Sequence, residues 1–349
     1  MKQFVCVRIV QANALDLALF QFDFDLTFAA FFMNADKTIY GRYGTRSSQQ
    51  EATRDISLEG FRKSLEAALQ IHQRYPALRP SLLAKTGARP TIAVPEEYPT
   101  LSRFKATLDY QGAVAKSCMH CHQIHDAQRE VLRAAKKPIP DSILYPWPHP
   151  NVVGLSLDPK QRATVTRVAP GSAADQAGFR PGDELLRASG QPLLSAADFQ
   201  WVLHNATEAA RIETVVRRGG GVIPLQLTLS DGWRRGDISW RTSTWDLRRM
   251  ALGGLFLESV SDDDRAAAKI DKTELALRVK HAGMYGAHAV AHRAGFKKGD
   301  IIVTFDGRTD AMTESQLLAY VLQKTTPGQQ LPVKVSRNGK RIDLKLKMQ

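Results

Sequence analysis

The chain has 349 residues, and 43% of them are hydrophobic, which predicts about two to three domains with packed cores and excludes a disordered chain. The longest strongly apolar run, Phe28–Met33, is far shorter than the about 18 residues that cross a bilayer. The net charge of +13 is spread along the chain, whereas nucleic-acid binders usually gather Lys and Arg on one element. We therefore expect a globular protein with no transmembrane segment and no nucleic-acid partner.

The first 75 residues contain the pattern of three strands and a helix. Phe4–Val10 alternates as a strand, Leu26–Met33 is typical of a buried strand, and the turn Asn34–Lys37 leads into a third strand, Thr38–Tyr43. Ser57 is a suitable N-cap for a helix that follows. The apolar stripe that predicts the buried face of this helix consists of Leu58, Phe61, Leu65, Ala68, Leu69 and His72.

This order of elements resembles the second half of a thioredoxin fold. The resemblance implies an N-terminally truncated, thioredoxin-like α/β unit in residues 1–75, and it places the dithiol of that family upstream of Met1. Cys6 is then expected to be a small core residue on a strand.

The most specific motif is Cys118-Met119-His120-Cys121-His122. A C-x-x-C-H string is typical of c-type haem attachment, in which both thiols bond to the vinyl groups and the histidine becomes an axial iron ligand. Half of a structural zinc site and a thioredoxin-like redox pair are the alternatives. The only other cysteine is Cys6, and the stretch before Cys118 is polar and helix-forming, so we expect one covalent haem c, with His122 as proximal ligand, in a small helical segment of residues 76–150.

A second iron ligand must approach from the opposite face of the haem. His120 and His125 are disfavoured, because one lies between the two cysteines and the other is one helical turn from His122. The candidates for the distal position are His72 on the predicted helix and His149 in a proline-rich loop, followed by the methionines Met33 and Met119.

The second half of the chain contains an internal repeat. Ala177–Asp183 reads A-G-F-R-P-G-D, and Ala294–Asp300 reads A-G-F-K-K-G-D. A helix and a hairpin follow in each copy. Together with Val165–Ala174, this order resembles bacterial PDZ domains, which implies two PDZ-like β-barrel or sandwich domains, in residues 151–230 and 253–349.

The resemblance also implies a peptide-binding loop in the first copy. Gly154, Leu155, Ser156 and Leu157 match the loop and strand whose amides receive a peptide carboxylate while the peptide extends the sheet edge. Gly254–Leu257 is the less clear match in the second copy, which carries an insertion at Ser259–Arg265. Rigid spacer domains are the alternative. Residues 231–252 are predicted to be a linker rich in Trp and Arg.

Motifs of hydrolytic enzymes are absent from the sequence. There is no G-x-S-x-G, no H-E-x-x-H and no glycine-rich phosphate loop, which predicts a carrier or binding protein rather than an enzyme. Haem attachment of this type takes place outside the bacterial cytoplasm, although Met1–Val7 has no secretory signal. We expect a periplasmic or otherwise exported protein whose signal sequence is missing from this chain.

The sequence thus predicts an α+β multidomain protein: a periplasmic c-type monohaem protein with a truncated thioredoxin-like region and two PDZ domains. Its expected function is electron transfer or redox sensing, with the PDZ modules docking a protein or peptide and with an unidentified redox partner. Two alternatives stay open. One is a peptide-binding PDZ scaffold with a structural haem, and the other is a thioredoxin-like oxidoreductase whose dithiol lies upstream of Met1.

Overall fold

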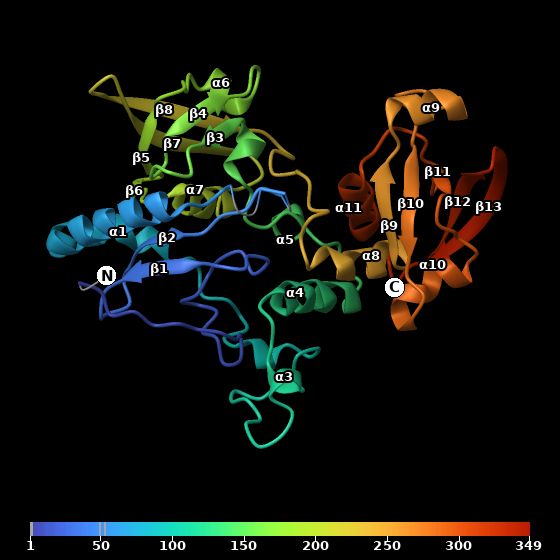
Figure 1. Cartoon of the computed structure of the whole chain (residues 1–349), viewed down its shortest axis with the longest axis horizontal. Helices are drawn as coiled ribbons and strands as arrows, with labels where there is room; N and C mark the ends of the chain where they lie inside the picture. Colours follow the sequence, from blue (N-terminus) through green and yellow to red (C-terminus); the bar gives the residue numbers. More distant parts are fainter. Residues whose placement is uncertain (1–2, 49, 52–53) are drawn as a thin grey trace. The chain divides into compact units, whose positions relative to one another are not determined.

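The computed structural model describes residues 3–48, 50–51 and 54–349 (Figure 1). The chain forms two compact units, and each contains one copy of the sequence repeat. The first unit comprises Met1–Cys121 and Tyr145–Gly236, and the second comprises His122–Leu144 and Asp237–Gln349. The domain boundaries predicted from the sequence remain predictions.

The first unit begins with an antiparallel hairpin. Strand β1 (Ala30–Met33) pairs with β2 (Ile39–Tyr43), and the turn between them is the one that the sequence predicts. Asn34 Oδ1 accepts a hydrogen bond from the Thr38 N–H (3.0 Å), which closes the turn. Every residue of β2 is buried, so the hairpin is covered by other parts of this unit.

Helix α1 (Leu58–Gln73) begins where the sequence places it. Ser57 Oγ accepts a hydrogen bond from the Gly60 N–H (3.0 Å), as an N-cap does. The buried face differs from the predicted stripe, because Leu58 is 88% exposed. Phe61 and Leu65 of the predicted stripe are partly buried against the core, and the fully buried residues of the helix are Gly60, Ser64, Ala67, Ala68 and Ile71.

Short helical elements follow in this unit and complete its N-terminal part. They are α2 (Tyr75–Leu82), η1 (Leu83–Lys85), η2 (Pro95–Glu97) and α3 (Val114–Ser117).

The thioredoxin-like prediction is wrong. Among the described residues, the sheet that contains β1 has only two strands, and Phe4–Val10 is not a strand. Val5 and Val7 are 95% and 82% exposed. Alternating β-branched residues show only that a segment favours an extended conformation. To form a strand, the segment also needs the edge of a neighbouring strand that supplies hydrogen bonds. Cys6 is exposed and is therefore not a core residue.

The first sequence repeat forms a small β-domain in the same unit. Its core contains Leu155, Phe179, Leu185, Phe199 and Leu203, all almost completely buried. Strands β3 and β4 pair with each other, and a four-stranded sheet has the order β6-β5-β7-β8. The elements are η3 (Pro150–Val153), β3 (Leu155–Leu157), β4 (Val165–Val168), α6 (Ala173–Gln176), β5 (Glu184–Ala188), β6 (Gln191–Pro192), α7 (Ala196–His204), β7 (Ala210–Arg218) and β8 (Gly221–Leu229).

The second unit is built around a five-stranded sheet of the order β13-β12-β11-β10-β9. Arg133 of its first helix fixes that helix to the C-terminal part of the unit, because its guanidinium donates to the backbone oxygens of Thr325 (2.6 Å) and Gln349 (2.7 Å). The elements are α4 (His122–Ala134), α5 (Asp141–Leu144), α8 (Thr244–Leu252), β9 (Leu255–Ser259), α9 (Asp262–Ala268), β10 (Leu277–Ala282), η4 (Gly286–Ala289), α10 (Val290–Arg293), β11 (Ile301–Phe305), α11 (Glu314–Lys324), β12 (Gln330–Arg337) and β13 (Lys340–Lys347).

The mixed α+β class of the prediction is confirmed. Within the part of the chain that the structure describes, no helix is both long enough and apolar enough to cross a membrane.

Candidate peptide-binding site

The predicted peptide-binding loop lies at the start of β3. Gly154 has a left-handed backbone (φ 92°), and a Cβ at this position would overlap with Ser172 Oγ. Gly254 repeats this situation in the second copy: its φ is 91°, and a Cβ would overlap with the backbone oxygen of His288. Both loops therefore require glycine, for the same two reasons.

One edge of β3 pairs with β4. The Gly154 oxygen accepts from the Ala169 N–H (2.8 Å), the Ser156 oxygen accepts from Thr166 Oγ1 (3.1 Å), and the Asp158 N–H donates to Thr164 (2.8 Å). Because successive residues of a strand direct their backbone groups to opposite edges, those of Leu155 and Leu157 face away from β4.

The outward edge of β3 pairs with no other strand among the described residues. Helix α7 packs on the same core, since Phe199 and Leu203 share a cluster with Leu155. A strand edge beside a helix is the arrangement in which an added peptide strand gains main-chain hydrogen bonds and side-chain contacts.

The opposite face of α7 is held by a buried ion pair. Lys85 Nζ lies 2.8 Å from Asp198 Oδ1, and both side chains are fully buried. Asp198 also accepts from the N–H groups of Arg42 (3.1 Å) and Leu194 (2.9 Å). Burial lowers the pKa of Lys85 despite the neighbouring carboxylate. These contacts fix α7 as a rigid wall beside β3.

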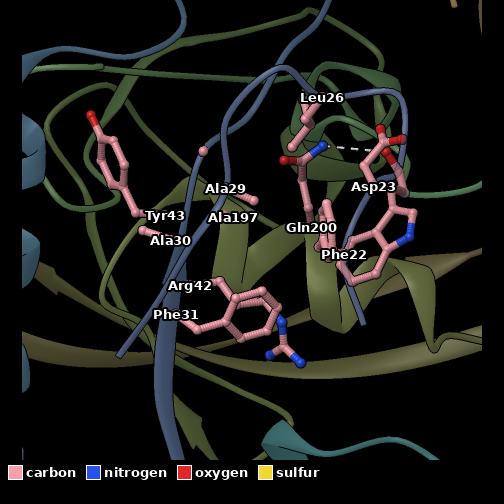
Figure 2. A pocket seen from close by; sticks show the side chains of 12 residues that line it. Phe22, Asp23, Leu26, Ala29, Ala30, Phe31, Arg42, Tyr43, Ala197 and Gln200 are labelled. Atoms are coloured by element: carbon pink, nitrogen blue, oxygen red, sulfur yellow. Dashed lines mark hydrogen bonds between the residues drawn. The ribbon is translucent and has the colours of Figure 1, made fainter. Parts of the chain in front are cut away.

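A small cavity adjoins this network (Figure 2). Its lining includes Phe31, Arg42, Trp147 and Gln200, and its volume is about 10 Å³, enough for about one water molecule. The Arg42 guanidinium stacks on Trp201 (4.0 Å to the ring centroid), and its burial lowers the pKa of Arg42 to about 10. The cavity is too small for an organic ligand.

Helix α1 adjoins the outer end of the β3–α7 pair. Ser57 Oγ donates to the Pro159 oxygen (2.7 Å) in the loop after β3, and Ser64 Oγ donates to the Leu194 oxygen (3.0 Å) just before α7. Lys63 Nζ donates to Gln161 Oε1 (2.7 Å) in the same loop. The helix thus links the two elements that would flank a bound peptide.

The corresponding edge in the second repeat is occupied by the chain itself. The Leu257 N–H, which matches that of Leu157, donates to Glu314 Oε1 (2.7 Å). Glu314 is the first residue of α11, and its carboxylate also binds Arg248 Nε (3.0 Å) and Nη2 (2.6 Å). Arg248 is 1% exposed and lies over the ring of Phe256 (4.2 Å). In the first repeat α7 begins with Ala196, which has no carboxylate.

Sequence reasoning missed the roles of Glu314 and Arg248. An acidic residue in the first turn of a helix is ordinary, because it complements the helix dipole. The signal available was the Trp and Arg content of the segment before β9, which the sequence analysis assigned to a linker. Part of that segment is instead helix α8, whose Arg248 reaches α11.

The residues of the C-x-x-C-H motif lie around the start of α4. Cys118 and Cys121 are half-buried free thiols, and Met119 between them is completely buried. His122 is in the first turn of α4, with Nδ1 3.4 Å from Asp126 Oδ2. Burial raises the pKa of the Asp126 carboxyl.

The two predicted distal histidines are engaged in local hydrogen bonds. His72 Nδ1 lies 2.8 Å from Tyr40 Oη, near the end of α1. His149 Nδ1 accepts from the Asn151 N–H (3.3 Å) at the start of η3. Met33 ends strand β1.

Comparison with protein families identifies both repeats. Residues 164–218 and 288–348 each match a model described as a PDZ domain. The chain carries two PDZ domains. We refer to the copies around β3 and β9 as PDZ1 and PDZ2.

The curated relatives are proteases. The chain is 23% identical over 185 residues to a probable periplasmic serine endoprotease, DegP-like, of Marinomonas sp. strain MWYL1; the match covers 53% of this chain and 37% of the relative. A protein of the same description from Pseudomonas savastanoi pv. phaseolicola is 23% identical over 198 residues, 56% of this chain and 39% of the relative. The chain thus spans well under half the length of the curated relatives it matches.

Solved structures with similar parts are also proteases. The HtrA-type protease AlgW with decapeptide is 19% identical, with a TM-score of 0.26, over 53% of this chain and 52% of that chain. The serine endoprotease from Yersinia pestis is 24% identical, with a TM-score of 0.21, over 23% of this chain and 28% of that chain.

These comparisons overturn the haem predictions. The relatives are serine endoproteases, which do not carry covalent haem c, so the prediction of a c-type monohaem protein that transfers electrons or senses redox state is wrong. The haem roles assigned to Cys118, Cys121 and His122, and the distal roles of His72 and His149, depended on that cofactor. The C-x-x-C-H spacing misled because it fixes the separation of the thiols and not the chemistry they serve.

The same relatives correct three further predictions. The curated relatives are named serine endoproteases, which contradicts the prediction of a carrier or binding protein. The alternative of a peptide-binding PDZ scaffold is partly compatible with the two PDZ domains but is not favoured, and its structural haem is wrong, as is the alternative of a thioredoxin-like oxidoreductase. The curated relatives are periplasmic, and the PDZ domains indicate peptide or protein binding.

Proposed function

We propose that this protein recognises peptide segments of its substrates through PDZ1 and acts in periplasmic proteolysis of the HtrA/DegP type. The observation that carries the proposal is the contrast between the two strand edges. In PDZ2 Glu314 occupies the outward Leu257 amide, whereas the matching helix position in PDZ1 is Ala196. PDZ1 is thus the copy built to accept a peptide strand.

In this proposal Gly154, Leu155, Ser156 and Leu157 form the peptide-binding segment. The Gly154 N–H donates to the Asn151 oxygen within the tight turn (3.0 Å), so the outward Leu155 N–H is the amide suited to receive a terminal carboxylate. The outward groups of Leu155 and Leu157 pair with the ligand backbone. The rigid α7, held by Asp198 and Lys85, forms the other wall.

The experiment compares two fluorescent peptides of the same sequence, one with a free C-terminal carboxylate and one amidated. A pool of decapeptides with apolar C-terminal residues is titrated with the full chain, and the peptide that binds best is then tested in both forms. We expect amidation to weaken binding at least about tenfold, because a charge-assisted set of hydrogen bonds is lost. Equal affinity for the two peptides would contradict carboxylate recognition.

The proteolytic part rests on the relatives and is tested separately. The protein is incubated with an unfolded, fluorescently labelled protein, with and without a serine-reactive inhibitor. Release of fragments that the inhibitor blocks is the expected result. Absence of inhibitor-sensitive cleavage would overturn the proteolytic part while leaving the peptide titration unaffected.

A further inference from the structure

The two cysteines of the C-x-x-C string lie in the short connection between α3 and α4. Cys118 follows directly on the last residue of α3, in extended conformation (φ −81°, ψ 121°), and His122 opens α4 directly after Cys121. Both thiols are free, and both residues are partly exposed to solvent. The proposed function makes no use of either residue.

The backbone between the thiols is anchored at Met119. Its N–H donates to Asn13 Oδ1 (2.8 Å), and its carbonyl oxygen accepts from the Ala12 N–H (3.0 Å). Asn13 Nδ2 also donates to the oxygens of Ser117 (3.0 Å) and Lys105 (2.7 Å). One buried asparagine thus fixes the residues on both sides of Cys118.

This anchoring affects the conformational entropy that closure of a disulfide between Cys118 and Cys121 would cost. Closing a cross-link costs less conformational entropy when the residues between the linked positions have little freedom to lose. Only two residues lie between Cys118 and Cys121, and one of them, Met119, is already fixed by hydrogen bonds. The two groups also act on each other electrostatically: burial raises the pKa of the Cys121 thiol, and the Cys118 thiolate raises it further. The separation of the two cysteines in the sequence is that of redox-active C-x-x-C motifs.

Metal binding does not account for the pair. Within the described part of the chain, neither Cys118 nor Cys121 belongs to any cluster of three or more His, Cys, Asp or Glu side chains with ligand atoms close together. A tetrahedral zinc site needs four such ligands.

We propose that Cys118 and Cys121 are a reversible dithiol that closes to an intramolecular disulfide. Each thiol gives up its proton, one sulfur–sulfur bond forms, and two electrons pass to an external disulfide, which is reduced to two thiols. Oxidised glutathione is such an oxidant. The step goes beyond peptide recognition and proteolysis, and it suits an oxidising compartment such as the periplasm.

The test incubates the folded, reduced protein with oxidised glutathione and follows its intact mass. Closure of the disulfide removes two hydrogens from the parent, and tryptic digestion without reduction places this loss in the peptide Ser117–Arg129, which contains both motif cysteines. The Cys6→Ser variant is the matched control, because Cys6 is exposed and lies outside the motif; it is expected to close as the parent does. Cys118→Ser and Cys121→Ser are expected to stop instead at a mixed disulfide with glutathione.

Three outcomes would overturn the proposal: a Cys6→Ser variant that accumulates glutathione adducts, covalent dimers of that variant, or a disulfide in the parent that includes Cys6. The redox equilibrium is measured in buffers of reduced and oxidised glutathione, where the parent is expected to show one reversible transition that both motif variants lack. Circular dichroism shows whether the Ser variants are folded, so that loss of disulfide formation is not confused with loss of the fold.

Discussion

Arg218 and Asp183 form a two-point ion pair in PDZ1, with Nε 2.7 Å from Oδ1 and Nη2 2.7 Å from Oδ2. PDZ2 repeats the pair with Arg337 and Asp300 at 2.6 and 2.7 Å. In both copies the carboxylate is essentially buried, and the arginine also donates to the carbonyl oxygen of the glycine in A-G-F. The aspartate of the repeated G-D string is thus the anchor of the hairpin arginine.

This ion pair predicts that alanine substitutions of two adjacent arginines have very different effects on the stability of PDZ1. Arg218→Ala leaves the buried Asp183 carboxylate without its cation, so we expect a loss of about 3 kcal/mol in the free energy of unfolding of PDZ1. Arg217→Ala removes a pair with Glu184 whose arginine is 53% exposed, and it is expected to cost under about 1 kcal/mol. Urea unfolding monitored by tryptophan fluorescence measures both. Equal effects of the two substitutions would contradict this role of Asp183.

The contact between Glu314 and the Leu257 amide predicts the stoichiometry of peptide binding. Because PDZ2 fills its own strand edge, calorimetric titration of the full chain is expected to give one peptide bound per chain. Two equivalent sites would contradict the assignment of binding to PDZ1.

The same contact predicts a stability effect in PDZ2. Glu314→Ala leaves Arg248 buried without its carboxylate, and we expect a loss of about 3–5 kcal/mol in the free energy of unfolding. Glu258→Ala is the control, since Glu258 pairs with Lys280 on the surface and is expected to cost under about 1 kcal/mol. Urea unfolding of both variants provides the measurement.

The thiol pair predicts a pH dependence for disulfide closure. The thiolate is the attacking species, and burial raises the pKa of Cys121 above its ordinary value of 9.0, so that less thiolate is present at any pH below that value. The rate of closure with oxidised glutathione is therefore expected to rise with pH and to keep rising beyond the point where an exposed thiol levels off. A rate that levels off near pH 9 would indicate an unperturbed thiol and a rate that is flat above neutral pH an activated thiol, and either result would contradict the prediction.

The asparagine anchor predicts a second effect on the same reaction. Asn13→Ala removes its hydrogen bonds to the backbone of Ser117, Met119 and Lys105, and the freed connection is expected to close more slowly. Stopped reactions analysed by mass spectrometry measure the change. Asn151→Ala, far from the motif in the sequence, is expected to leave the rate unaltered.

Local signals in the sequence predicted local structure well. Ser57 caps α1 as expected, and the two A-G-F-x-x-G-D strings mark equivalent turns because Gly178, Gly182, Gly295 and Gly299 all have positive φ. Such requirements act within a few residues and are therefore visible in a single sequence. The assignment of Gly154 to a peptide-binding loop came from the resemblance to PDZ domains and stays a prediction.

Features that depend on distant parts of the chain were not predictable in this way. Phe4–Val10 has strand propensity but no strand beside it, and Glu314 resembles any acidic helix start until its contact with Leu257 is seen. The C-x-x-C-H spacing is shared by different chemistries, and only the relatives excluded haem. In each case a residue's neighbours in space decide its role.

The most direct test of peptide recognition by PDZ1 compares two proline variants. The Leu157 N–H faces the open edge of β3, so Leu157→Pro removes a donor to the peptide without removing a hydrogen bond to β4. Val222→Pro is the matched control, because Val222 is 64% exposed and lies on the edge strand β8, two residues before Pro224. Residues two apart in a strand direct their backbone groups to the same edge, so the Val222 N–H points to solvent, as the proline nitrogen does. Titrated with a free-carboxylate peptide, Val222→Pro is expected to bind like the parent and Leu157→Pro at least about tenfold more weakly. Parent-like binding by a folded Leu157→Pro variant would contradict the account.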